Sequence, residues 1–131
     1  MAFTSQTNAT VTQVRAAIQY NGFGANQANL SLYNDANGTP GVLLAGPVAV
    51  TNLPTFYTCC TLAVANFPHG GVPVTAGTQY WVVADTPLSG TGSDFYGVWA
   101  LAPSGNGVAA DVGTGWFAFL AGQPAGAVYG K

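Results

Sequence analysis

Apolar and polar side chains alternate along much of the chain, with a period of two residues. Val14, Ala16 and Ile18 fall on one face of an extended segment. Arg15 and Gln19 fall on the opposite face. Alternate residues of a β-strand line its two faces, so this pattern predicts a strand with one apolar face.

The same alternation recurs downstream in two further segments. In ANLSLY, Leu30 and Leu32 point to one side and are expected to face the core. In QYWVVAD, both sides are apolar, with Tyr80 on one face and Trp81 on the other. Trp81 is therefore expected to pack in the core, and Trp116 in GWFAFL is interpreted in the same way.

Turn-forming residues separate the predicted strands. They include NDANGTPG at 34–41 and PHGG at 68–71, and the pair Gly46 and Pro47 interrupts a segment in a way typical of a bulge or an edge strand. No apolar helical stripe continues over three turns. About nine short strands at this spacing predict an all-β fold. We expect a single antiparallel, jelly-roll-like β-sandwich domain over residues 1–131.

The small number of charged residues narrows the classes of partner. Only 5% of the 131 residues are charged, and Arg15 and Lys131 are the only basic residues. Two cations cannot neutralise a phosphate backbone or an anionic membrane surface, so neither partner is expected. No apolar run approaches the roughly 20 residues of a membrane span. Weak charge repulsion favours self-association, and the composition favours an extracellular protein.

Four segments resemble bacterial secreted β-sandwich domains, often called choice-of-anchor domains, that precede a cell-surface sorting tail. The segments are LSLYNDANGTPGVLLA, NLPTFYTCCTLAVANF, VPVTAGTQYWVVADT and GWFAFLAGQPAGAVYG. The most specific parts are Leu53–Cys60 and Ala76–Trp81. The resemblance implies an extracellular or cell-surface module without catalytic activity, and it implies no particular ligand.

Catalytic residue patterns are weak. His69 is the only histidine and falls in a turn, where a solvated side chain is the ordinary interpretation. Asp85 and Asp94 flank one loop, as the two carboxylates of a glycosidase would, but aspartate is also a common turn residue. No nucleophile elbow, zinc motif or phosphate-binding loop is present. The sequence therefore predicts a protein that is not an enzyme.

One turn offers oxygen ligands of the kind that calcium prefers. Asn34, Asp35 and Asn37 lie close together in the sequence and are a candidate structural calcium site. The alternative is that these residues only form the turn, because asparagine, aspartate and glycine suit turn geometry. No other cofactor is expected.

Aromatic side chains offer a second kind of site, because their rings stack on sugars while polar atoms stay hydrated. Tyr96 and Trp99 are an odd number of residues apart, so one of them faces outward unless both sheet faces are covered. Phe23, Phe56 and Tyr57 fall in predicted loops. They form either a plug over the end of the sandwich or a binding surface. The candidate ligand-binding set is Phe23, Phe56, Tyr57, Cys59, Cys60, Tyr96 and Trp99.

The only two cysteines, Cys59 and Cys60, are neighbours. Their Cα atoms are about 3.8 Å apart, below the usual disulfide range of roughly 4.4–6.8 Å. Three interpretations stay open: two free thiols, a strained vicinal disulfide beside the loop aromatics, or bridges between subunits. The vicinal disulfide is favoured.

Two functions from different classes follow. The first is attachment to a glycan or another cell-surface polymer through the loop aromatics. The second is a structural subunit that assembles into a homo-oligomer, filament, coat or layer through open sheet edges.

Overall fold

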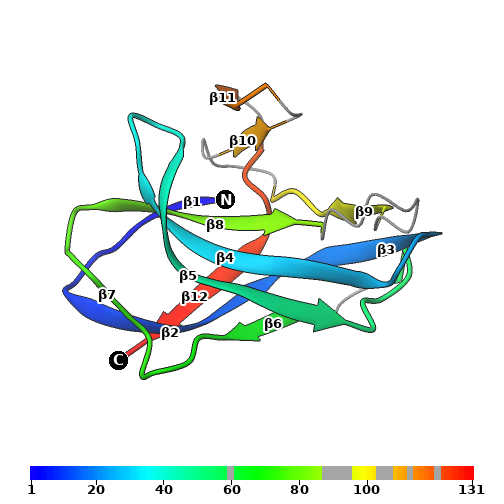
Figure 1. Cartoon of the computed structure of the whole chain (residues 1–131), viewed down its shortest axis with the longest axis horizontal. Helices are drawn as coiled ribbons and strands as arrows, with labels where there is room; N and C mark the ends of the chain where they lie inside the picture. Colours follow the sequence, from blue (N-terminus) through cyan, green and yellow to red (C-terminus); the bar gives the residue numbers. More distant parts are fainter. Residues whose placement is uncertain (59–60, 87–95, 103–107, 112–113, 120–121) are drawn as a thin grey trace.

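The computed structural model describes the chain except residues 59–60, 87–95, 103–107, 112–113 and 120–121. The described residues form twelve strands and no helix (Figure 1). Their bounds are β1 Ala2–Thr4, β2 Ala9–Ala16, β3 Ile18–Phe23, β4 Gln27–Asp35, β5 Pro40–Thr51, β6 Ala63–Asn66, β7 Val72–Val74, β8 Gln79–Asp85, β9 Tyr96–Trp99, β10 Val108–Asp111, β11 Trp116–Phe119 and β12 Gly126–Gly130.

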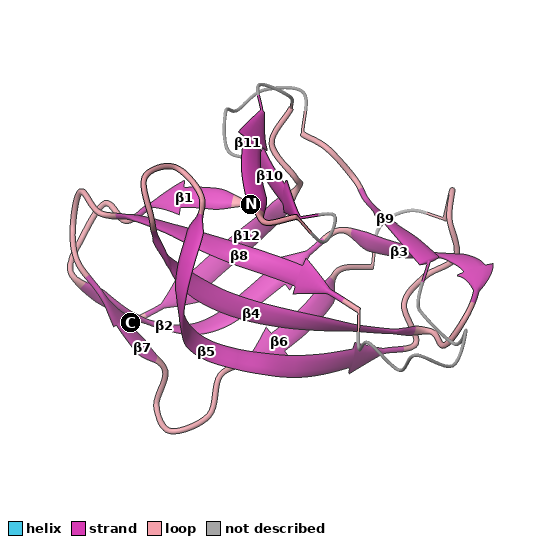
Figure 2. Ribbon diagram, turned by 45° about the horizontal axis from the view of Figure 1, so that its top comes forward, coloured by secondary structure: helices cyan, strands magenta, loops and turns pink. Residues whose placement is uncertain are grey.

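Two antiparallel sheets form the layers. The first, called the β8 sheet, has the order β1-β8-β4-β5. The second, called the β2 sheet, has the order β12-β2-β6, and β7 also pairs with β2. β3 continues the path of β2 and pairs with β9, whereas β10 and β11 pair only with each other among the described strands. Figure 2 shows the β8 sheet and the β2 sheet stacked with their strands crossing at an angle.

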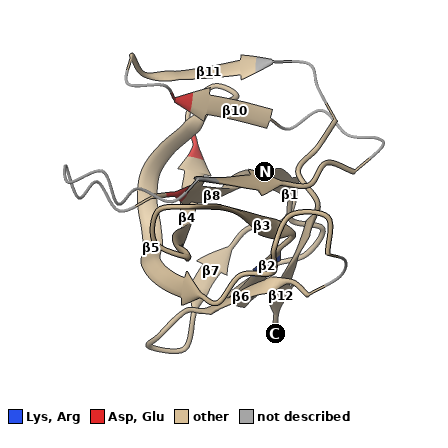
Figure 3. Cartoon of the chain, turned by 90° about the vertical axis from the view of Figure 1, so that its right-hand side faces the viewer, with Lys and Arg blue, Asp and Glu red and all other residues tan. Residues whose placement is uncertain are grey.

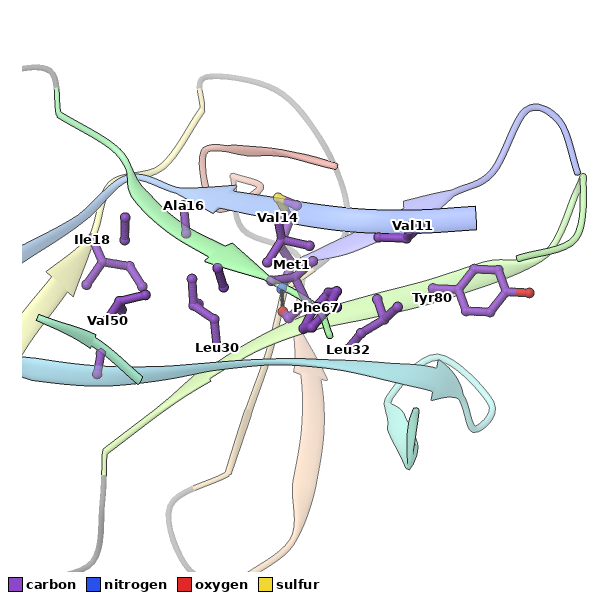
Figure 4. Close-up of a cluster of buried hydrophobic side chains, with 14 of the residues drawn as sticks. Met1, Val11, Val14, Ala16, Ile18, Leu30, Leu32, Val50, Phe67 and Tyr80 are labelled. Carbon is purple, nitrogen blue, oxygen red and sulfur yellow. Dashed lines mark hydrogen bonds between the residues drawn. The ribbon is translucent and has the colours of Figure 1, made fainter. Parts of the chain in front are cut away.

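The main core lies between these two sheets. Val14, Ala16 and Ile18 are buried from one side, and Leu30 and Leu32 are fully buried from the other (Figure 4). The inward faces predicted from the alternation are therefore confirmed. Burial of one such aliphatic side chain stabilises a fold by roughly 1.5–3 kcal/mol, so these residues hold the layers together.

A smaller apolar cluster lies on the other face of the β8 sheet. Ala2, Trp81 and Val83 are buried there, and Tyr33, Ala109 and Trp116 pack against them. Figure 3 shows β10 and β11 as a third level over the β8 sheet. The hairpin explains why β8 is apolar on both faces, and it confirms that Trp81 and Trp116 are packing residues.

The all-β, antiparallel prediction is confirmed, and the layers are consistent with a β-sandwich. The expected number of about nine strands is wrong. One reason is that the segment containing Val14, Ala16 and Ile18, which was predicted as one strand, divides at Ala17 into β2 and β3. There the chain changes partner: Ala17 N donates to Ala125 O beside β12, while Ala17 O accepts from Ala100 N beyond β9. Two three-residue strands, β1 and β7, add to the number.

The predicted turn chemistry is also confirmed. Asn37 and Gly38 have φ values of 56° and 87° at the tip of the β4–β5 hairpin. At Gly46, the register of β5 against β4 shifts and a Cβ atom would meet Leu30 O at 2.8 Å, so only glycine fits. β5 is an edge strand of the β8 sheet, so this segment has both the bulge and the edge position expected of it.

Candidate functional site

Two of the three predicted loop aromatics, Phe56 and Tyr57, lie on a segment that is fixed against β3. The loop prediction is wrong for Phe23, which is the last residue of β3 and pairs with Tyr96 of β9. Tyr20 N donates to Pro54 O at 2.8 Å, and Phe56 N donates to Tyr20 O at 2.9 Å. Gln19 Nε2 also donates to Thr58 O at 2.8 Å. The segment 54–58 is thus held by main-chain and side-chain hydrogen bonds along the neighbouring strand.

The base of this segment is fixed as well. Asn26 Nδ2 donates to Leu53 O at 2.9 Å, and Asn26 Oδ1 accepts from Leu53 N at 2.8 Å. The Leu53 side chain is buried in the main core. The loop therefore leaves the core from a rigid position.

Two large aromatics project into solvent at this end of the molecule. Tyr57 is 88% exposed and Phe23, at the end of β3, is 69% exposed. The Phe56 and Tyr57 ring centroids are 4.0 Å apart, with an interplanar angle of 44°. We call Phe23, Phe56 and Tyr57 the aromatic end. Figure 1 shows the end of β3 and the segment after β5 at the same end of the molecule.

The other predicted ligand-binding residues are placed differently. Trp99 packs against the main core, and its Nε1 donates to Ala125 O at 2.8 Å. Tyr96 is in β9 opposite Phe23, but its side chain lies outside the description. Cys59 and Cys60 lie outside the described residues, so the three interpretations of the pair stay open.

The candidate calcium turn uses its oxygens for hydrogen bonds. Asn34 Oδ1 accepts from Val42 N at 2.5 Å. Asp35 accepts from Gly38 N, from Gln79 Nε2 at 2.8 Å and from Trp81 Nε1 at 2.7 Å. Partial burial acts to raise the pKa of Asp35, but the hydrogen bonds from Trp81, Gly38 and Gln79 bring it below the usual value. These donors account for the turn, and calcium there stays a prediction.

The candidate catalytic residues do not form a cluster among the described residues. His69 is exposed at a turn with a φ of 58°, Asp85 is exposed at the end of β8, and Asp94 lies outside the description. Within the described ranges, no group of three His, Cys, Asp or Glu side chains is placed to hold a metal.

The sequence did not predict a groove between the β8 sheet and the β10–β11 hairpin. The groove has a volume of about 880 Å³ and is lined by Tyr33, Trp116, Asp85 and Asp111, among others. Asp111 Oδ1 accepts from Gly115 N at 3.0 Å. The only sequence signal was the apolar outer face of β8, which shows that something covers this face but not which segment does.

No protein-family model, no curated protein and no solved structure matches this chain. The similarity to choice-of-anchor domains thus stays a prediction from the quoted segments. In the part of the chain that the structure describes, no helix is long and apolar enough to cross a membrane.

Proposed function

We propose that the chain is a non-catalytic, jelly-roll-like β-sandwich module that attaches to a glycan on an extracellular or cell surface through its aromatic end. The observation that carries this proposal is Tyr57. The residue is 88% exposed, and its backbone has a φ of 68°, in the left-handed region. Non-glycine residues in this region are strained by about 1–2 kcal/mol, and such strain concentrates at functional positions.

The surroundings of Tyr57 suit a neutral sugar. The segments 18–27 and 51–58 contain no charged residue, and they carry amide and hydroxyl side chains next to the rings. A pyranose ring offers C–H groups to an aromatic face and hydroxyl groups to amides. Because hydrogen bonds fix segment 54–58 along β3, little conformational entropy is lost when a ligand binds.

The test compares three forms of the protein on a glycan array and in pull-downs with insoluble polysaccharides. Tyr57→Ala removes the ring, and we expect a loss of affinity of about threefold to tenfold, the usual worth of one aromatic contact. Tyr57→Phe keeps the ring and should bind nearly as the wild type does. Val42→Ala, an exposed apolar position on the β4–β5 hairpin, is the matched control.

Two results would contradict the proposal. The first is folded wild-type protein that binds no glycan. The second is a Tyr57→Ala variant that binds as tightly as the wild type. Circular dichroism on each variant establishes that it is folded.

A specific observation favours self-assembly as a second candidate function. β5 is an edge strand, and its residues Val42, Leu43 and Leu44 are exposed, Val42 by 66%. An exposed apolar edge is a template for pairing with another chain. Light scattering coupled to size-exclusion chromatography tests this function over a range of concentrations. Leu43→Lys should abolish association, and a wild type that stays monomeric throughout would exclude this function.

A further inference from the structure

The outer face of the β2 sheet carries a connected row of polar and aromatic side chains. In the strand register, Gln13 is paired with Tyr129 on one side and with Asn66 on the other. Arg15 is paired with Ala127 and Val64 in the next row. Residues paired across antiparallel strands share a face, and Val14 and Ala16 on the opposite face are in the core. These side chains therefore point away from the core.

Contacts on this face fix the position of the guanidinium group. Arg15 Cζ lies 4.6 Å from the centroid of the Tyr129 ring. Arg15 Nε donates to Gln13 Oε1 at 2.7 Å, and Gln13 Nε2 donates to Asn66 Oδ1 at 2.7 Å. A guanidinium group stacked on a ring and held through Nε keeps its two terminal nitrogens together at one edge.

Among the residues that the structure describes, that edge has no acidic partner. Among the described residues, the contacts of the Arg15 guanidinium are the Tyr129 ring and Gln13, and no carboxylate pairs with it. The two terminal nitrogens of an arginine match the two oxygens of a carboxylate in spacing and plane. The face thus presents an ordered, uncompensated cation of the geometry that binds a carboxylate.

The distribution of charge strengthens this assignment. Both basic residues lie on the β2 sheet side: Arg15 is in β2, and Lys131 follows β12 and bonds to Thr10 through its main chain. The described acids lie elsewhere, with Asp35 in β4, Asp85 in β8 and Asp111 in β10. Figure 3 shows these aspartates in red on the side of the β8 sheet and its hairpin. Stacked sheets are about 10 Å apart, near the screening length at physiological salt, so the acids oppose an incoming anion only weakly.

We propose that this face, made by Arg15, Gln13, Asn66 and Tyr129, binds the carboxylate of a uronic acid unit in an acidic polysaccharide. The carboxylate accepts from the terminal nitrogens of Arg15, and the amides of Gln13 and Asn66 bond to ring hydroxyl groups. Tyr129, 45% exposed, supports the guanidinium group and offers apolar contact. This surface is distinct from the aromatic end and does not depend on the function proposed for that end.

A second copy of the chain is a poorer occupant. In each copy, two of the three described acids already accept hydrogen bonds, Asp35 from three donors and Asp111 from Gly115 N, and the exposed Asp85 is a single carboxylate at the end of β8. A polymer of uronic acids presents a carboxylate on every unit and carries hydroxyl groups for the two amides. The charge and the amides together favour the polysaccharide.

The test is affinity electrophoresis of the full chain in gels that contain polygalacturonate. Fully methyl-esterified polygalacturonate is the matched polymer without carboxylate charge, and dextran sulfate is the anionic polymer without carboxylates. We expect retardation by polygalacturonate alone, weakened as salt is raised from 50 to 500 mM. Arg15→Gln should lower the affinity at least tenfold, and Arg15→Lys should lower it less, because a lysine keeps the charge but loses the paired donors.

Three controls make the result decisive. Lys131→Gln changes the net charge by the same amount, so an equal loss of affinity in this variant would overturn the proposal. Tyr57→Ala should leave polygalacturonate binding unchanged, which separates this surface from the aromatic end. Thermal melting of Arg15→Gln establishes that the variant is folded.

The proposal is also overturned if the wild type is not retarded, if the esterified polymer or dextran sulfate retards it equally, or if Arg15→Gln binds as the wild type does. A wild-type oligomer that dissociates in Arg15→Gln, without a change in retardation, would assign the face to a second copy instead.

Discussion

The outer faces of the two sheets have opposite characters. On the β8 sheet, the outward side chains of Trp81 and Val83 are buried because the β10–β11 hairpin covers them. On the β2 sheet, the outward side chains of Arg15 and Gln13 are only partly buried, and Val64 beside them is 41% exposed. A strand is apolar on both faces where both are covered and amphipathic where one face meets water.

The two faces also differ in the partners of their charged side chains. Near the covered face, Asp35 is satisfied by three different donors, including Trp81 Nε1. On the open face, the described contacts of the Arg15 guanidinium are the Tyr129 ring and Gln13, and neither is a carboxylate. A charge close to a covered face must be satisfied within the protein, whereas one on an open face can take a partner from outside.

The largest expected effect comes from removing a packed side chain on the covered face. Trp81→Ala should lower the free energy of unfolding by about 3–5 kcal/mol, because it leaves a cavity under the hairpin. The matched change on the open face, Gln13→Ala, should alter it by at most about 0.5 kcal/mol. Urea denaturation of both variants measures the difference. Equal effects would show that the hairpin does not cover this face in solution.

The next effect concerns the space between the layers, where Met1 is buried (Figure 4). Its amino group donates to Val82 O at 2.8 Å, and burial lowers its pKa from 8.0 to about 5. The unfolded chain binds this proton at higher pH than the folded chain does. Stability is therefore greatest above pH 8, falls as the pH drops and levels off below pH 5. The loss between pH 8 and pH 5 should be about 3 kcal/mol.

Denaturation at several pH values checks this prediction on the chain with a free amino group at Met1. A profile that is flat between pH 8 and pH 5 would mean that the amino group is not buried in solution.

The sequence predicted the main core well, because a period of two marks the inward face of a strand whatever its partner is. Leu30 and Leu32 are fully buried, as their alternation with polar neighbours requires. The break at Ala17 was not predicted, since it depends on which strands lie beside it. The exposure of Tyr57 agreed with its position in a predicted loop, but its left-handed backbone has no signal in the local sequence.

The candidate surfaces were also predicted only as far as local periodicity allows. The outward positions of Arg15 and Gln19 followed from the alternation. The contact between Arg15 and Tyr129 could not be predicted from the alternation, because it joins strands from opposite ends of the chain. The groove beside Trp116 requires the hairpin to fold back on the β8 sheet, which no local pattern specifies. Local periodicity thus predicts which side chains face inward, and long-range pairing decides which exposed ones meet.

A smaller effect is expected at Asp35, beside the covered face. Asp35→Ala should lower the free energy of unfolding by about 1–2 kcal/mol, because Trp81 Nε1 loses its acceptor. Since the folded pKa is lowered, the carboxylate stabilises the fold above its unfolded pKa and loses that effect as the pH falls through the folded value. Asp85→Asn, at an exposed acid of the neighbouring strand, is the control. Equal losses in the two variants would refute this account.

A final pair of variants tests the comparison with one chemical change at two matched valines. Val64 and Val83 both point outward from their sheets, Val64 into solvent and Val83 under the hairpin. Threonine has nearly the same shape and suits strands as valine does, so the two substitutions differ mainly in whether the new hydroxyl group is hydrated. Val64→Thr should change the free energy of unfolding by less than about 0.5 kcal/mol, whereas Val83→Thr should lower it by about 1–3 kcal/mol. Thermal and urea denaturation measure both. If Val83→Thr were as mild as Val64→Thr, water would have to reach the outer face of β8, and the contrast between a covered and an open face would fail.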